Sequence, residues 1–272
     1  MKFVMFSKLL KELSPSQLAD SMLDLEFDGF DLCVREGYPV NPDNVATALP
    51  AVAKGWKARG LTVELVTTEG GFTDPVKPDV EPLMAACSEI GCRRIKLGYW
   101  VWRGEPYWER VDTIRKALEG FQKLCAKYEV RVMCHTHSGP YYGSNCAGGM
   151  LLVKGFDPRY VGIYIDPGHL AMGGENLPMA FSMVKDYLRM VAVKSPGWFK
   201  TEKDGAVKWE HRLVPLREGM VDWRQVLTLM KEHGYDGPMS LHSEYEDLSR
   251  ADLLARTRDD LAYLKGLAGE IG

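Results

Sequence analysis

The sequence lacks long apolar runs. No stretch of the 272 residues approaches the ~20 consecutive apolar residues of a membrane-spanning helix. Within the N-terminal segment 1–13, the apolar stretch between the lysines is too short for a signal peptide. We therefore expect a cytoplasmic protein with no membrane partner.

Paired cysteines are absent too. The six cysteines are scattered along the chain and form no CxxC pair. This spacing argues against a disulfide framework and against a zinc site built from thiolates. Most of these cysteines are expected to be small buried residues.

The sequence also lacks a large excess of charge of one sign. The formal net charge is -3, and the 34 Lys and Arg residues form no long run. Nucleic-acid binding normally requires a basic stripe, so we expect no nucleic-acid partner. A small molecule is the expected partner, and a homo-oligomer is compatible with the composition.

Short β-type runs alternate with amphipathic helical stretches from end to end. The eight runs are 2–6, 29–34, 61–66, 93–99, 130–135, 161–166, 190–194 and 238–242. This alternation, at a length near ~250 residues and without a linker, predicts an α/β protein with one (β/α)8 barrel domain over 1–272. A doubly wound sheet is the alternative.

Two segments stand out between these runs. The stretch 105–128 carries apolar residues at helical spacing and predicts a long helix packed on a sheet. The stretch 195–220 is too long for a simple strand-to-helix connection. It predicts a loop excursion over the barrel mouth, with a hairpin turn at 203–206.

Four of the six histidines follow directly after β-type runs: His135, His137, His169 and His242. In an alternating strand-helix chain, the loops after the strands meet at one face, where active sites are built. Together with Asp166, these side chains provide the imidazoles and carboxylates that a divalent metal binds. Hydrogen-bonded histidines without a metal are the alternative.

Four motifs, taken in order, resemble those of the xylose isomerase-like TIM barrels. They are EFDGFDL at 26–32, DPGH at 166–169, VPLREGMVDW at 214–223 and GYDGPMSL at 234–241. The resemblance covers nearly the whole chain. It implies a TIM barrel related to sugar-phosphate isomerases and epimerases, a superfamily that also contains the endonuclease IV fold.

The resemblance implies a divalent metal held by a Glu after strand 5, an Asp after strand 6, a His on strand 7 and a Glu after strand 8. This chain has His135, Asp166, Ala192 and His242 at these positions. The implied ligands are His135, Asp166 and His242, for one Mn, Zn, Fe or Co ion. One carboxylate in place of three leaves the ion net positive and makes it a stronger Lewis acid.

In sugar epimerases similar to this chain, the paired glutamates also move the proton. A histidine that binds a metal does not easily take that role, so another group must act as acid or base. The titratable candidates are His137, His169, Glu244 and Lys194. A loop hydrogen bond for His137, a turn for His169, a salt bridge for Lys194 and surface exposure for Glu244 are the alternative roles.

Aromatic side chains are frequent in the loops expected at the mouth. They are Tyr99, Trp100, Trp102, Tyr141, Tyr142, Trp198 and Phe199. Aromatic rings stack on the C–H faces of sugars, so we expect Trp100, Trp102, Tyr141 and Trp198 to bind a carbohydrate. Asp31, at the position of a family Glu on strand 2, is a further expected substrate contact.

The leading prediction is a metal-dependent isomerase or epimerase that acts on a sugar, keto-sugar or cyclic polyol through a metal-stabilised enolate. A lyase or dehydratase acting on a keto-sugar or glycoside with the same site is the first alternative. A sugar-binding barrel without catalysis is the second. DNA repair of the endonuclease IV type is disfavoured, since the ends of strands 3 and 4 carry no histidine.

Overall fold

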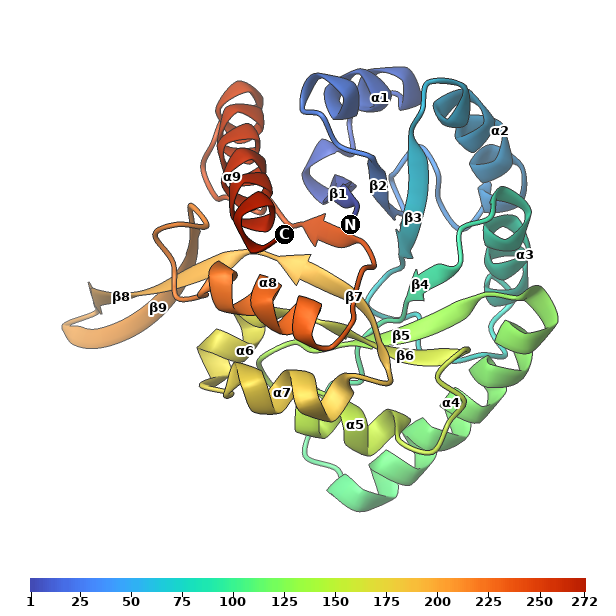
Figure 1. The fold of residues 1–272 in the computed structure, drawn as a ribbon. Helices are drawn as coiled ribbons and strands as arrows, with labels where there is room; N and C mark the ends of the chain where they lie inside the picture. Colours follow the sequence, from blue (N-terminus) through green and yellow to red (C-terminus); the bar gives the residue numbers. More distant parts are fainter.

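Eight parallel strands close into a barrel in the computed structural model, which describes residues 1–272 (Figure 1). Their order around the barrel is β1-β10-β7-β6-β5-β4-β3-β2. The strands are β1 (Phe3–Phe6), β2 (Gly29–Cys33), β3 (Thr62–Thr67), β4 (Arg94–Lys96), β5 (Arg131–His135), β6 (Val161–Ile165), β7 (Leu188–Val193) and β10 (Met239–Leu241). The predicted (β/α)8 barrel is confirmed, and the doubly wound alternative is wrong.

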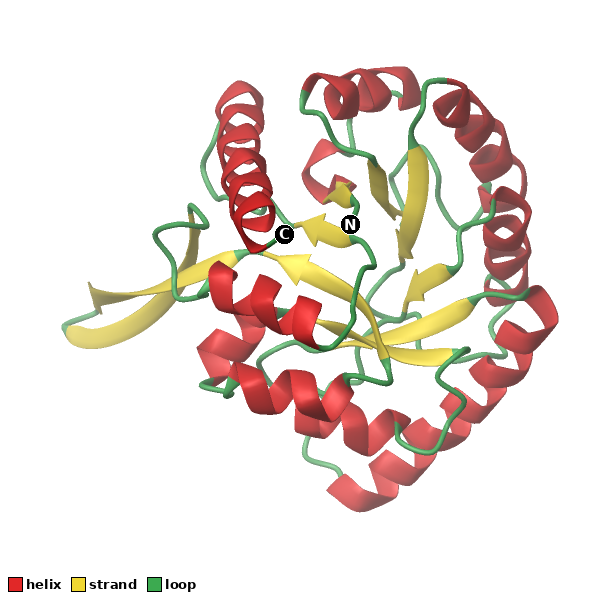
Figure 2. Ribbon diagram, viewed as in Figure 1, coloured by secondary structure: helices red, strands yellow, loops and turns green.

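Helices form a ring around the barrel (Figure 2). They are η1 (Ser7–Leu10), α1 (Pro15–Asp24), α2 (Val45–Ala58), α3 (Val80–Ile90), α4 (Tyr107–Tyr128), α5 (Cys146–Val153), α6 (Pro167–Gly173), α7 (Leu177–Val184), α8 (Trp223–Glu232) and α9 (Arg250–Ile271). Six of the α-helices begin after a Ser, Asn or Asp whose side chain accepts a backbone N–H, which satisfies a donor that the helix leaves free. No helix combines the length and the apolar composition needed to span a bilayer.

The barrel interior is filled by a small apolar cluster. It contains Val4, Leu65, Met133, Tyr164, Met190 and Ala192. Side chains two residues apart on a strand point to the same face. Residues two positions beyond Met133, Tyr164 and Ala192 therefore form a polar layer above this cluster, and they are His135, Asp166 and Lys194.

The excursion after β7 is a β-hairpin. Strand β8 (Ser195–Lys203) pairs antiparallel with β9 (Ala206–Val214), and Asp204 and Gly205 form the turn with φ of 56° and 72°. Figure 1 shows the hairpin beyond the ring of helices, so its predicted position over the mouth is wrong. Only Lys194 separates β7 from β8, and the chain runs straight outward instead of folding back.

Candidate active site

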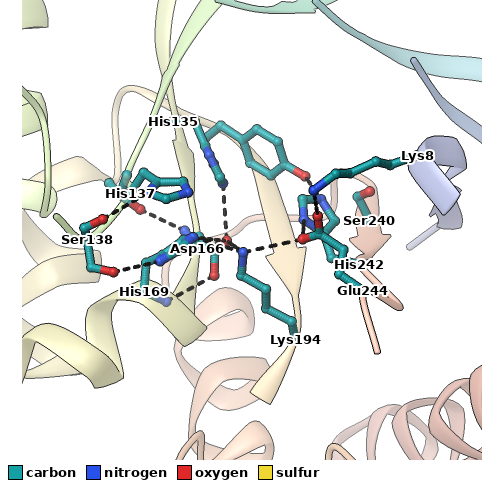
Figure 3. Close-up of polar contacts among 12 residues, drawn as sticks. Lys8, His135, His137, Ser138, Asp166, His169, Lys194, Ser240, His242 and Glu244 are labelled. Carbon is teal, nitrogen blue, oxygen red and sulfur yellow. Dashed lines mark hydrogen bonds and ion pairs between the residues drawn. The ribbon is translucent and has the colours of Figure 1, made fainter. Parts of the chain in front are cut away.

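The site is built around the carboxylate of Asp166, which is fully buried at the start of α6 (Figure 3). Its Oδ1 accepts the backbone N–H of His169 at 3.1 Å, and its own N–H donates to Thr136 Oγ1 at 2.8 Å. These bonds aim Oδ2 into the mouth. There it faces Lys194 Nζ at 3.1 Å, His135 Nε2 at 3.2 Å and His169 Nε2 at 3.7 Å.

Two of these buried atoms, His135 Nε2 and Asp166 Oδ2, make no well-aligned hydrogen bond, although Lys194 Nζ lies within ion-pair distance of Oδ2. The other ring nitrogen of His135 lies 2.8 Å from the hydroxyl of Tyr99. Unsatisfied buried polar atoms are costly, and a shared cation would satisfy both. Two ligand atoms, each ~2.1 Å from one metal ion and about 90–110° apart, lie ~3.0–3.4 Å from each other. The observed 3.2 Å therefore fits a common ion.

His242, the third implied ligand, has a different partner. Its Nε2 lies 2.8 Å from the hydroxyl of Tyr164 and 3.6 Å from Asp31 Oδ2. Its ring centroid is 6.2 Å from that of His135. As the side chains lie, no group of three His, Cys, Asp or Glu residues is arranged to hold a metal. The structure thus brings two of the implied ligands together and places the third beside them.

Lys194 and His169 form a close pair. The ammonium of Lys194 donates to His169 Nε2 at 2.8 Å. Since an ammonium only donates, Nε2 of His169 must accept, and its Nδ1–H then donates to Ser138 Oγ at 2.9 Å. Burial lowers the pKa of His169 to about 3, so its imidazole is neutral at physiological pH.

One ring nitrogen of His137, Nε2, makes no hydrogen bond. Its Nδ1 lies 2.9 Å from the carbonyl oxygen of Ser138, which only accepts, so Nδ1 carries the proton. Burial lowers the pKa of His137 to about 4. A neutral imidazole with an available Nε2 lone pair therefore lies against the ring of His169, with the two ring centroids 3.8 Å apart.

Glu244 is ionised at this side of the site. Burial alone would raise the pKa of its carboxyl, but His242, Lys194 and Lys8 outweigh it and lower the pKa to about 2. Lys8 binds Oε1, and Lys194 Nζ lies 3.7 Å from Oε2. Such an acidic carboxyl is a weak proton acceptor, and it is suited to holding the two ammonium groups.

The family model for xylose isomerase-like TIM barrels matches residues 20–267. This chain belongs to that family. Ala192, the position where the resemblance implies a strand 7 ligand, is fully buried in the apolar cluster inside the barrel. A methyl group there closes the floor of the site instead of adding a donor.

Curated relatives include the inosose dehydratase of Lacticaseibacillus casei, with 24% identity over 147 residues. That match covers 51% of this chain and 48% of the relative, so this family member spans about half the length of the curated relatives it matches.

Solved structures with this fold include a 3-keto-D-glucoside 4-epimerase from E. coli. It has a TM-score of 0.75 and 16% identity, with 98% of this chain and 99% of that one covered. An L-ribulose 3-epimerase gives a TM-score of 0.76 at 13% identity, covering 99% and 95%. A xylose isomerase-like protein from Mycobacterium smegmatis, in complex with magnesium, gives 0.72 at 16%, covering 100% and 98%. These matches show the shared fold.

Among the aromatic residues expected to bind substrate, the structure brings Tyr141 to the site. Its ring centroid lies 4.9 Å from that of His137. Trp100 is packed in the main apolar core, and Trp102 is exposed on the loop after β4. Trp198 lies on strand β8 of the hairpin, away from the site, and is exposed. The sequence placed all of these rings in loops, but it did not show which way each ring points.

Asp31 lies beneath the site and is fully buried. Its Oδ1 accepts from the Thr67 hydroxyl at 2.5 Å, and its Oδ2 accepts from Ser240 at 2.7 Å. The carboxylate is also 3.6 Å from His242 Nε2. As placed, Asp31 lies beside His242, and each of its carboxylate oxygens accepts a hydrogen bond from a neighbouring hydroxyl.

Four residues of the site were missed by sequence reasoning: Lys96, Tyr99 as a partner of His135, Ser138 and Tyr164. Tyr164 could have been found because it lies on β6, two residues before Asp166, so the two side chains point to the same side of the strand. Lys96 could have been found as a charged residue inside the β-type run 93–99. No sequence signal identifies Ser138.

The lowered pKa of Lys96 should make the free energy of unfolding depend on pH. Burial and the charge of Arg35 lower its pKa from the ordinary 10.5 to about 7. Between these values the unfolded chain binds more protons, so the free energy of unfolding rises with pH. We expect Lys96→Met to remove this rise. Denaturant unfolding of both proteins from pH 7 to 10 in phosphate-free buffer tests it, and parallel curves would contradict it.

Proposed function

We propose that this chain is a metal-dependent isomerase or epimerase that acts on a carbohydrate through an enolate. The observation that carries the proposal is the cluster around Asp166. A buried carboxylate there faces the imidazole of His135 and the ammonium of Lys194, and the neutral imidazoles of His169 and His137 lie beside them. Such a cluster joins ion-binding donors to groups that accept and donate protons.

His135 Nε2 and Asp166 Oδ2 would hold the ion, and His242 would join them by exchanging its contact with Tyr164. A bound divalent ion polarises a carbonyl oxygen and acidifies the neighbouring C–H group. Neutral imidazoles and an ionised carboxylate are the protonation states that metal binding needs. The pKa shifts of His135 and Asp166 supply them. Burial lowers the pKa of His135. Burial acts to raise the pKa of Asp166, but the neighbouring Lys194, His169 and His135 together lower it well below its ordinary value.

The chain's own residues would move the proton. His137 Nε2 accepts the proton from the carbon next to the carbonyl. Negative charge that develops on the enolate raises the pKa of the imidazole and favours this transfer. Lys194 donates to the substrate oxygen, and His169 shares the proton of Lys194 through their 2.8 Å hydrogen bond.

A dehydratase is the second candidate. It uses the same proton abstraction, but Lys194 protonates a leaving hydroxyl instead of an enolate oxygen. The similarity to inosose dehydratases over half of the chain favours it. Its substrate would be a keto-sugar or a related cyclic polyol.

Deuterium exchange tests the proposal. Wild-type protein with Mn, Zn, Fe or Co is incubated in D2O with a panel of keto-sugars and cyclic keto-polyols, and proton NMR follows the carbon-bound hydrogen next to the carbonyl. We expect exchange, with a new epimer for an epimerase or loss of water for a dehydratase. His137→Gln is expected to slow exchange at least ~100-fold.

The matched control is His211→Gln, because His211 is exposed on the hairpin. It should exchange at the wild-type rate. Absence of exchange with every sugar and ion, combined with a sugar-dependent rise in melting temperature, would contradict the proposal and support a barrel that only binds sugar.

A further inference from the structure

The barrel mouth contains two cationic side chains without an acidic partner. Lys8 and Lys194 each contact a carboxylate, Glu244 or Asp166. Lys96, at the end of β4, and Arg35, just after β2, take part in no ion pair. Charges in such positions are normally paired, so their isolation needs an explanation.

Lys96 is 3% exposed, yet it makes one hydrogen bond, from Nζ to the carbonyl oxygen of Leu97 at 3.1 Å. Its ammonium also lies 3.9 Å from the ring centroid of Tyr99. An ammonium has three N–H donors, so two remain available. No hydrogen bond or ion pair joins Lys96 to the nearby Asp31, whose oxygens accept from Thr67 and Ser240.

Arg35 lies beside Lys96 across the end of β3. Its Nε donates to the carbonyl oxygen of Thr68 at 3.1 Å, and the hydroxyl of Thr68 donates to the carbonyl oxygen of Lys96 at 2.7 Å. The two terminal nitrogens of the guanidinium have no partner. The charge of Arg35 is close enough to help lower the pKa of Lys96 to about 7.

We propose that Lys96 and Arg35 bind an acidic group of the substrate, a carboxylate or a phosphate. This inference rests on the proposed function and names its substrate class as an acidic carbohydrate. An anion between the two side chains would use the free ammonium and guanidinium donors and remove the repulsion between them.

The position of the anion fits the rest of the site. Tyr99 lies over Lys96, and its hydroxyl contacts His135 Nδ1 at 2.8 Å. An acidic group bound on the β2 to β4 side would therefore hold the rest of the carbohydrate against the cluster at β5 to β7. A substrate anchored at one end in this way presents a fixed carbon to the catalytic groups.

Anion binding can be measured without turnover. The probes are inorganic phosphate, acetate, glucuronate, glucose 6-phosphate and glucose, each followed by melting temperature and calorimetry at constant chloride. We expect the wild type to bind at least one acidic sugar at least about tenfold more tightly than glucose. Preference for glucuronate identifies a carboxylate, and preference for glucose 6-phosphate identifies a phosphate.

The variants are Arg35→Gln, Lys96→Met and their double, with Arg103→Gln as the control, since Arg103 is an exposed cation on the loop after β4. The double variant should lose the preference for the acidic sugar, while the control keeps it. Circular dichroism verifies folding, and Arg35→Gln, at a partly exposed position, gives a second measurement if Lys96→Met unfolds.

Equal affinity of the wild type for acidic and neutral sugars, or an unchanged preference in the double variant, would overturn the inference. The outcome is separate from that of deuterium exchange. The variants could lose the preference for acidic sugars while the wild type shows no exchange with any sugar. That result would support the anion site and contradict the proposed reaction.

Discussion

Asp166→Asn is expected to lower the rate of deuterium exchange at least ~1000-fold, because one carboxylate serves several functions at once. Asp166 Oδ2 faces His135, His169 and Lys194, and it would supply the one negative charge among the implied metal ligands. An amide of the same shape removes that charge and places a donor or a neutral oxygen against the ammonium. Bound metal, measured by elemental mass spectrometry, should fall from about one ion per chain towards zero.

The fold should survive this change. Asn is as good a helix N-cap as Asp, and its oxygen can accept the N–H of His169. Asp222→Asn is the matched control, since Asp222 also caps a helix, α8, with a bond to Gln225 N at 2.9 Å. The control should keep its activity and metal. Equal metal content in the wild type and Asp166→Asn would contradict the assignment of Asp166 as a ligand.

Gly29→Ala is expected to destabilise the protein by about 3 kcal/mol or more. Gly29 has a φ of +155°, and a Cβ added there would lie 1.8 Å from the carbonyl oxygen of Thr62. The two residues are partners in the register of β2 and β3. An alanine must therefore push the strands apart beneath the site. Denaturant unfolding monitored by tryptophan fluorescence measures the loss.

Gly55→Ala is the control for that prediction. Gly55 lies in α2, and a Cβ there would meet nothing within 4 Å. Alanine in a helix interior is more favourable than glycine by roughly 0.5–1 kcal/mol. We expect a small gain in stability. A loss in Gly29→Ala no larger than the change in Gly55→Ala would show that the strands separate without cost.

The motif EFDGFDL at 26–32 shows that a short sequence motif can depend on contacts with distant parts of the chain. It is one of the four motifs that resemble the family pattern. Its physical role appears in the structure, where Asp28 Oδ2 accepts the N–H of Phe3 and Gly29 allows close approach to β3. The motif joins three strands, so its residue types are set by contacts distant in sequence.

The sequence by itself determined the barrel, the positions of its strands and the convergence of the histidines. Alternating periodicities report which face of each element is buried, and parallel βα units bring all strand ends to one side. His135, His137, Asp166, His169, Lys194 and Glu244 therefore meet at the mouth, as expected from their places after strands 5 to 8.

Tertiary structure decided the rest. Side-chain directions decide that Trp100 points into the core. Contacts with other strands decide that the hairpin points away from the mouth and that both oxygens of Asp31 accept hydrogen bonds. Protonation states also arise there, because burial and neighbouring charges together set the pKa of His137, His169 and Glu244. Such shifts come from three-dimensional surroundings, which strand periodicity does not describe.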